Sequence, residues 1–224
     1  MVYQDGFLQD YFLKRRLTLQ NTVWTIASLI EEHRLQAPDT AEAVAVFRCV
    51  EIEPNPGTKG ILKLRASIPQ ENDHEERTVN YLSENEPKVL QVLADAGCSS
   101  APKLLAHDMF TQADDMCDPE GYIVCIMMEA LPGETLEFNQ YWALGREERD
   151  KIREAFRLAI TDVGNCGVEH WDPRIRNILW DEEKGKCYIV DFENGEPIDP
   201  TEFEWDEFYW QRWELSKRYG GSEW

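Results

Sequence analysis

The segment from 167 to 197, GVEHWDPRIRNILWDEEKGKCYIVDFENGEP, constrains this chain more than any other stretch. It holds two short apolar runs, 178–180 and 187–190, and the polar residues between them include Gly185, a turn signal. This pattern predicts two short strands joined by a tight turn. Polar side chains stand at the open ends of the predicted hairpin: Asp172, Asn177 and Asp191. We expect them at one rim, where two carboxylates and an amide oxygen would suit a hard cation.

The spacing His170-x-Asp172-x-x-x-x-Asn177, followed by Asp191-Phe192-Glu193, resembles the catalytic loop and metal-binding motif of protein-kinase-like enzymes. The second motif ends in Glu rather than Gly, which looks most like the small-molecule branch, the aminoglycoside and choline phosphotransferases. The resemblance implies that Asp172 is the catalytic base, in a loop that begins at His170. It also implies that Asn177 and Asp191 bind Mg²⁺. The alternative is an ordinary hairpin with polar ends.

Two arginines lie between the predicted base and the predicted metal ligand. Arg174 stands two residues past Asp172, where many protein kinases carry a lysine. Arg176 stands four residues past it, where others carry an arginine. Either guanidinium could neutralise charge on a transferring phosphoryl group.

Length and charge exclude several classes of protein. The 224 residues, 42% of them hydrophobic, suffice for one domain or two small lobes and argue against disorder. The formal net charge of −20 disfavours nucleic acid as a partner. We find no apolar run of about 18 residues and no signal-peptide core, and therefore expect no membrane span. The six scattered cysteines are expected to be buried free thiols of a cytoplasmic protein.

Apolar spacing in the first third of the chain predicts two helices and then a hairpin. We expect one helix within residues 1–20 and another over 21–36. Residues 43–53 and 61–66 are β-rich, and the Pro- and Gly-containing stretch 54–60 predicts a turn between them.

Lys63 lies in the middle of the second predicted strand and faces away from its apolar neighbours. The kinase resemblance implies that Lys63 binds the α- and β-phosphates of a nucleotide. It further implies an acidic partner on the following helix, which we predict over 84–96, with Pro87 in its first turn and an end at Gly97. We select Glu86 as that partner, with Glu84 as the alternative.

One departure from the family lies just before Lys63. No G-x-G-x-x-G motif precedes it, and the nearby glycines, Gly57 and Gly60, fall in the predicted turn. The phosphate-covering loop of the family is therefore absent or replaced.

The remaining chain predicts a buried strand over 121–129, a helix over 147–165 and a terminal helix after 200. The stretch from Met128 to Leu136 resembles the family's hinge, which implies that the backbones of Glu129 and Leu131 meet an adenine. Four aromatic residues share one face of the terminal helix: Trp205, Phe208, Tyr209 and Trp213. We expect this face to pack on the protein; a docking surface for a protein partner is the alternative.

Together these features predict an α+β, two-lobed protein-kinase-like fold. An antiparallel-sheet lobe spans 1–130, and a reduced, mainly helical lobe spans 131–224. The implied function is transfer of the ATP γ-phosphoryl group, with Mg²⁺, to a hydroxyl of a small molecule or a protein. Two alternatives remain: a non-catalytic nucleotide-binding scaffold, and a kinase fold redirected to another transfer or condensation reaction.

Overall fold

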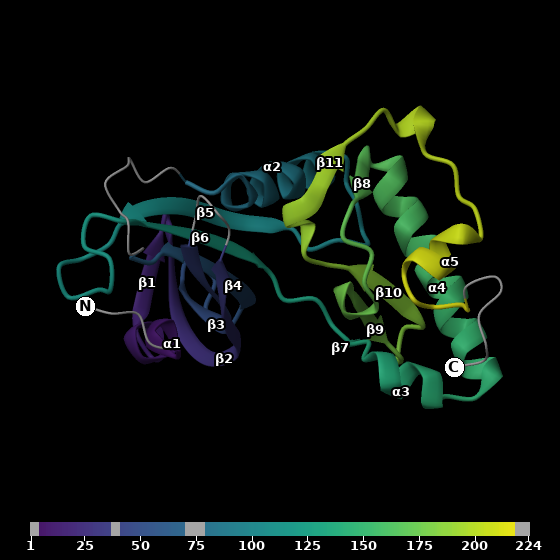
Figure 1. Ribbon diagram of the computed structural model, residues 1–224, viewed down its shortest axis with the longest axis horizontal. Helices are drawn as coiled ribbons and strands as arrows, with labels where there is room; N and C mark the ends of the chain where they lie inside the picture. Colours follow the sequence, from purple (N-terminus) through teal and green to yellow (C-terminus); the bar gives the residue numbers. More distant parts are fainter. Residues whose placement is uncertain (1–4, 37–40, 70–78, 218–224) are drawn as a thin grey trace. The chain divides into compact units, whose positions relative to one another are not determined.

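The computed structural model describes residues 5–36, 41–69 and 79–217, which form two compact units (Figure 1). Unit 1 comprises Met1–Pro87 and Leu104–Ala130, and unit 2 comprises Lys88–Lys103 and Leu131–Trp224. The predicted mixed α+β class is confirmed, as is the antiparallel sheet near the N-terminus.

Unit 1 is built on a six-stranded antiparallel sheet in the order β1-β2-β3-β4-β6-β5. Its strands are β1 (Arg16–Leu19), β2 (Thr22–Gln36), β3 (Ala41–Glu53), β4 (Lys59–Ser67), β5 (Leu104–Thr111) and β6 (Tyr122–Glu129). The strands predicted at 43–53, 61–66 and 121–129 are therefore confirmed. The sheet curls so that its two edge strands approach each other, and Nε2 of Gln20 donates to the carbonyl of His107 at 3.1 Å.

The helix predicted over 21–36 is wrong, because this stretch is strand β2. Trp24 and Ile26 are buried on one face, as alternation in a strand requires. Register shifts then follow, between Ile26 and Ser28 and between Leu29 and Glu31. Each bulge adds a residue and moves the later apolar side chains out of strict alternation, which produced a spacing resembling that of a helix.

The predicted N-terminal helix is confirmed only as the single short helix α1 (Phe7–Phe12). Leu8 and Phe12 bury their side chains in the core of unit 1. The helix ends at its C-cap Leu13, whose ψ of 132° is not helical; Lys14 then adopts a left-handed φ of 66°, and its N–H donates to the carbonyl of Ile26 in β2. Residues 16–19 then form β1, where helix was expected.

Helix α2 (Tyr81–Asp95) is the predicted helix of unit 1, but it begins three residues earlier than expected and continues into unit 2. Pro87 therefore lies inside the helix rather than in its first turn. Gly97 ends it as predicted, with a φ of 75° that favours glycine.

Gly60 lies within strand β4 and not in the turn where we placed it. A Cβ at this position would lie 2.7 Å from Cζ3 of Trp24 and 2.9 Å from Sδ of Met127. Close packing against these two core side chains therefore explains why position 60 is a glycine, without any role in a phosphate-binding loop.

Unit 2 combines helices with small antiparallel sheets. Its helices are α3 (Phe138–Ala143), α4 (Arg146–Asn165) and α5 (Phe208–Arg212), and its strands are β7 (Glu134–Thr135), β8 (Val168–His170), β9 (Ile178–Asp181), β10 (Lys186–Ile189) and β11 (Gly195–Pro197). Strands β9 and β10 form the predicted hairpin, with Ile178 opposite Ile189. Helix α4, predicted over 147–165, is confirmed and packs against β10.

The terminal helix is much shorter than the aromatic pattern indicated, because α5 has only five residues. Trp205 and Tyr209 stack with ring centroids 5.5 Å apart, and Trp213 is buried. Only Phe208 of the predicted aromatic face is strongly exposed. The segment therefore packs mainly on its own unit.

Two further observations concern the whole described chain. None of its helices is long and apolar enough to cross a membrane. All six cysteines are free thiols, and five of them are buried.

Candidate active site

His170 is buried in the predicted catalytic segment and connects two stretches of it by hydrogen bonds. It ends strand β8, and its Nδ1 accepts a hydrogen bond from the N–H of Asp172 at 3.2 Å. Its Nε2 lies 3.0 Å from the carbonyl of Val190. With Nδ1 accepting, Nε2 carries the proton and donates to that carbonyl. Burial, the largest influence, lowers the pKa of His170 below its ordinary value, so the neutral ring with one donor and one acceptor is favoured.

Asn177 provides a second connection between the same two stretches of chain. Its side chain is buried, and Nδ2 donates to the carbonyl of Asp172 at 2.9 Å and lies 3.4 Å from Oδ2 of that residue. The backbone carbonyl of Asn177 accepts from the N–H of Val190 at 3.0 Å. Residues 172, 177 and 190 are therefore held together, and Asp191 directly follows the last of them.

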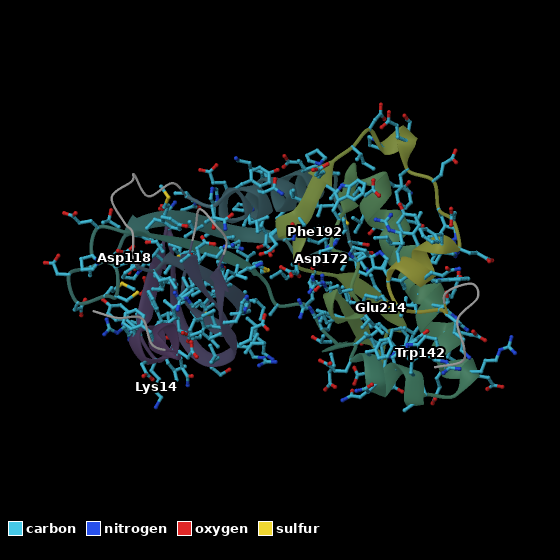
Figure 2. All side chains as sticks on the ribbon, viewed as in Figure 1. Lys14, Asp118, Trp142, Asp172, Phe192 and Glu214 are labelled. Carbon is cyan, nitrogen blue, oxygen red and sulfur yellow. The ribbon has the colours of Figure 1, made fainter. Side chains whose placement is uncertain are left out.

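Asp191 adopts a left-handed backbone conformation, with φ 67° and ψ 63°. Aspartate tolerates this region better than most residues, although it remains uncommon. The conformation turns the chain from the end of β10 into the short helix η2 (Phe192–Asn194), in which Phe192 is fully buried. The ring of Phe192 packs 5.1 Å from that of His170, which ties the second motif to the first. Figure 2 labels Asp172 and Phe192 among the side chains of unit 2.

The two predicted arginines differ in their surroundings. Nε of Arg174 lies 2.7 Å from Oδ1 of Asp172. The Arg174 side chain is 52% exposed, so solvent screens this ion pair and its contribution to stability is small. The ion pair matters instead for the reaction, because it places the Arg174 guanidinium on the carboxylate that we predict to be the base. Arg176 is exposed.

Lys63 and Glu86 form a buried ion pair in unit 1. Nζ of Lys63 lies 2.9 Å from Oε2 of Glu86, and the side chains are 8% and 1% exposed. Glu84, the alternative partner, is exposed on α2. The structure therefore places Glu86, and not Glu84, against the strand lysine. A lysine that is buried against a carboxylate keeps a fixed direction, as a phosphate-binding cation must.

A second buried ion pair lies next to the first, and the sequence reasoning missed it. Nη2 of Arg65 donates to Oε2 of Glu42 at 2.6 Å, and neither side chain is exposed. The same carboxylate accepts from three further groups, at 2.8 to 2.9 Å: Asn80 Nδ2, Ser83 Oγ and Tyr122 hydroxyl. Since Ser83 belongs to α2 and Arg65 to β4, this cluster fixes the start of the helix on the sheet.

A signal for Arg65 was present in the sequence. Arg65 follows Lys63 by two residues in one strand, so alternation places both side chains on the same face. Two cations on one buried face require two buried anions, and Glu42, at the start of the apolar stretch of β3, was an available candidate.

The predicted hinge residues lie at the end of β6. Glu129 pairs with Gly60 of β4, and the N–H of Ala130 lies 3.5 Å from the carbonyl of Lys59. Glu129 and Leu131 are half-buried. Their predicted role in binding adenine stays a prediction.

Glu214 is a further residue that sequence reasoning missed. It has a left-handed φ of 61°, and its Oε2 accepts from the N–H of Ile175 at 3.2 Å (Figure 2 labels Glu214). Beside it, the buried ring of Trp213 packs 5.0 Å from that of His170. The chain after α5 therefore supports the segment that carries Asp172. No local pattern announces a contact between residues 39 positions apart.

Comparison with known proteins gives a structural likeness but no sequence relative. No family model matches the chain, and no curated protein sequence matches it. Among solved structures, the chain is similar to the kinase PK-1 of Cydia pomonella granulovirus, with 16% sequence identity and a TM-score of 0.46. The match covers 78% of this chain and 52% of that one, so the chain spans about half the length of that kinase.

Proposed function

We propose that this chain is a kinase-like phosphotransferase that moves the γ-phosphoryl group of ATP to a hydroxyl acceptor. The observation that carries the proposal is the network of His170, Asp172, Asn177 and Val190. It gathers a partly exposed carboxylate, a buried amide and the start of the second acidic motif through hydrogen bonds that span up to 20 residues of sequence. An ordinary hairpin end would not need these connections.

The residues at this network fit a magnesium ion. Because Nδ2 of Asn177 is used in hydrogen bonds to Asp172, Oδ1 is the atom that could bind a cation. Together with the carboxylate of Asp191 it offers the oxygen ligands that Mg²⁺ prefers. Asn177 and Asp191 would hold the ion, which when bound would neutralise charge on the phosphates of the nucleotide.

Asp172 would orient the acceptor hydroxyl and accept its proton. Its backbone is fixed on both sides, by His170 at its N–H and by Asn177 at its carbonyl. Such fixation keeps the carboxylate in a defined position, which is the main requirement of phosphoryl transfer. Arg174 beside it could exchange this contact for one to phosphate oxygens.

Lys63 would bind the nucleotide phosphates, with Glu86 holding its ammonium group in place. The backbones of Glu129 and Leu131 would meet the adenine edge. The acceptor would be a small molecule or a protein that presents a hydroxyl group. These roles rest on the resemblance of the motifs together with the buried pairing of Lys63.

Replacement of the proposed base tests the function directly. The variant Asp172→Asn should lose at least ~100-fold in turnover of Mg-ATP, since proton transfer and acceptor orientation are removed. Its affinity for Mg-ATP, measured by titration calorimetry, should remain. The control Asp114→Asn changes an exposed loop carboxylate and should leave both quantities unchanged. Undiminished turnover in Asp172→Asn would refute the proposal.

A non-catalytic nucleotide-binding scaffold is the second candidate function. The ion pair between Arg174 and Asp172 favours it, because a cation on the carboxylate competes with an acceptor hydroxyl. Under this alternative, Mg-ATP raises the melting temperature while the variant Arg174→Ala shows no turnover. Turnover that appears or increases in Arg174→Ala would instead assign the arginine a restraining role in an active enzyme. Mass spectrometry of the products separates phosphoryl transfer from a redirected reaction.

A further inference from the structure

Two cysteines and an aspartate of unit 2 lie together outside the proposed catalytic network. Cys98 follows the end of α2, Asp162 lies in the last turn of α4, and Cys166 is the C-cap residue of that helix. One ligand atom from each of the three lies within 4.8 Å of the others. Sγ of Cys98 is 3.7 Å from Oδ2 of Asp162.

The local backbone explains why these side chains converge. Asp162 and Cys166 are four residues apart on a helix and therefore share a face. The N–H of Cys166 donates to the carbonyl of Asp162 at 3.0 Å, which keeps the last turn helical. On the other side, Gly97 has a left-handed φ and the N–H of Cys98 donates to the carbonyl of Leu93, so Cys98 is turned toward α4.

We propose that Cys98, Asp162 and Cys166 form a binding site for a thiophilic divalent cation, with zinc as the ion that fits best. Zinc binds thiolates at ~2.3 Å and carboxylate oxygens at ~2.1 Å in a tetrahedron, which places sulfur and oxygen ligands about 3.6 Å apart. The 3.7 Å between Cys98 and Asp162 already matches this edge.

The composition of the cluster selects the metal. Two sulfur ligands and one oxygen favour zinc or cadmium over magnesium or calcium, which prefer oxygen alone. The site is therefore chemically different from the all-oxygen site proposed at Asn177 and Asp191. Cys98 is buried, whereas Asp162 and Cys166 are only partly so, which leaves room for a water as the fourth ligand.

Bound zinc would stabilise the loop after Cys98 and helix α4, both of which contact the β9–β10 hairpin. The loop after Cys98 is bonded to β10: the carbonyl of Ser100 accepts from the N–H of Ile189 at 2.8 Å, and Nζ of Lys186 donates to the carbonyl of Ser99 at 2.7 Å and to its hydroxyl at 3.2 Å. Ser99 also donates to Asp162, through its N–H and its hydroxyl, at 3.0 Å each. An ion held by Cys98 and α4 would thus tie the loop, the helix and the hairpin together.

The proposal is tested with cobalt as a spectroscopic probe for zinc. The full chain, reduced and free of chelator, is titrated with Co²⁺ in the presence of excess Mg²⁺. We expect one equivalent of Co²⁺ to give a thiolate-to-metal charge-transfer band and intense visible bands of tetrahedral geometry. Zinc should then displace the cobalt. Absence of both sets of bands would overturn the proposal.

Variants locate the site. Cys166→Ser, at a partly exposed position, should weaken Co²⁺ binding by at least ~10-fold. The matched control Cys117→Ser changes a buried cysteine of unit 1 and should bind Co²⁺ like the unaltered protein. Equal loss in both variants would place the metal elsewhere and refute the assignment.

A measurement on the unaltered protein tests the same proposal without any substitution, and so does not depend on whether a variant folds. Stoichiometric zinc should slow alkylation of Cys98 and Cys166 by a maleimide, as mapped by peptide mass spectrometry, and leave the rate at Cys117 unchanged. Unchanged rates at all three cysteines would contradict the proposal. So would a Cys98–Cys166 disulfide in protein that, once reduced, takes up no metal.

Discussion

Nη2 of Arg65 lies 2.6 Å from Oε2 of Glu42, and both side chains are completely removed from solvent. This ion pair lies two residues along β4 from the pair of Lys63 and Glu86. Glu42 also binds Ser83 in the first turns of α2, so the helix that presents Glu86 is attached to the sheet by a separate carboxylate. The orientation of Lys63 therefore depends on Glu42 as well as on Glu86.

Loss of the Glu42 carboxylate should strongly destabilise the protein. In Glu42→Gln the buried Arg65 guanidinium loses the negative charge that lies 2.6 Å from its Nη2, and we expect the free energy of unfolding to fall by ~3–5 kcal/mol. Urea denaturation measures the change. Glu84→Gln, on the exposed side of α2, should stay within ~0.5 kcal/mol of the unaltered protein. A loss below 1 kcal/mol in Glu42→Gln would show that the cluster does not fix the helix.

Replacement of Lys63 should weaken nucleotide binding. A hydrogen bond to a charged group contributes ~1.5–3 kcal/mol, so Lys63→Met should lower the affinity for Mg-ATP by about 10–100-fold. Lys59→Met alters an exposed lysine of the same strand and serves as the control. Calorimetric titration gives both affinities, and a melting curve shows whether each variant is folded. Equal affinities in the two variants would remove Lys63 from the nucleotide site.

Tyr122 should make the stability depend on pH in the alkaline range. Burial, and after it the charge of Glu42, raises the pKa of this hydroxyl above its usual value of 10. The unfolded chain therefore releases this proton at lower pH than the folded chain does. Its contribution to stability is present below pH 10 and is lost as the pH rises above that value.

The variant Tyr122→Phe isolates this contribution. It loses the hydrogen bond to Glu42 at every pH, but above pH 10 its free energy of unfolding should fall less steeply with pH, by up to ~1.4 kcal/mol per pH unit. Urea denaturation at a series of pH values measures the two slopes. Parallel curves above pH 10 would contradict the assignment, whatever the constant offset between them.

Trp213 should contribute far more to stability than the tryptophan beside the predicted base. Its buried ring packs against Phe156 at 5.2 Å and His170 at 5.0 Å, so Trp213→Ala should cost ~3–5 kcal/mol. Trp171 is 51% exposed, and Trp171→Ala should cost no more than ~1 kcal/mol. Thermal and urea unfolding of the two variants compare them. Similar losses of stability in the two variants would mean that Trp213 and the segment after α5 contribute little to holding the predicted catalytic segment in place.

The sequence predicted those elements whose pattern is local. The β3–β4 and β9–β10 hairpins were recognisable because strand residues, turn residues and strand residues follow one another directly. Helix α4 was recognisable because its buried residues, from Ile152 to Gly164, repeat with helical spacing without interruption. Strand β2 was not, because its bulges shift Leu29 and Ile30 out of alternation and local spacing cannot distinguish a bulged strand from a helix.

The same difference applies to the candidate site. Asp172, Asn177 and Asp191 belong to one short segment with a recognisable spacing, and Lys63 with Glu86 follows from a strand and the next helix. Glu42 and Glu214 act on partners 23 and 39 residues away, through side-chain contacts that exist only in the folded chain. Supporting residues of this kind are set by packing, and a single sequence does not display packing.

The curl of the six-stranded sheet has a consequence for how this protein behaves at high concentration. Unpaired edge strands are templates on which a second chain can add and start aggregation. Here Gln20, next to the first edge strand, already uses the carbonyl of His107 on the last one. At this point one carbonyl of the last strand is already occupied, so a second chain has one backbone acceptor fewer to pair with, even though one strand of the sheet is 15 residues long.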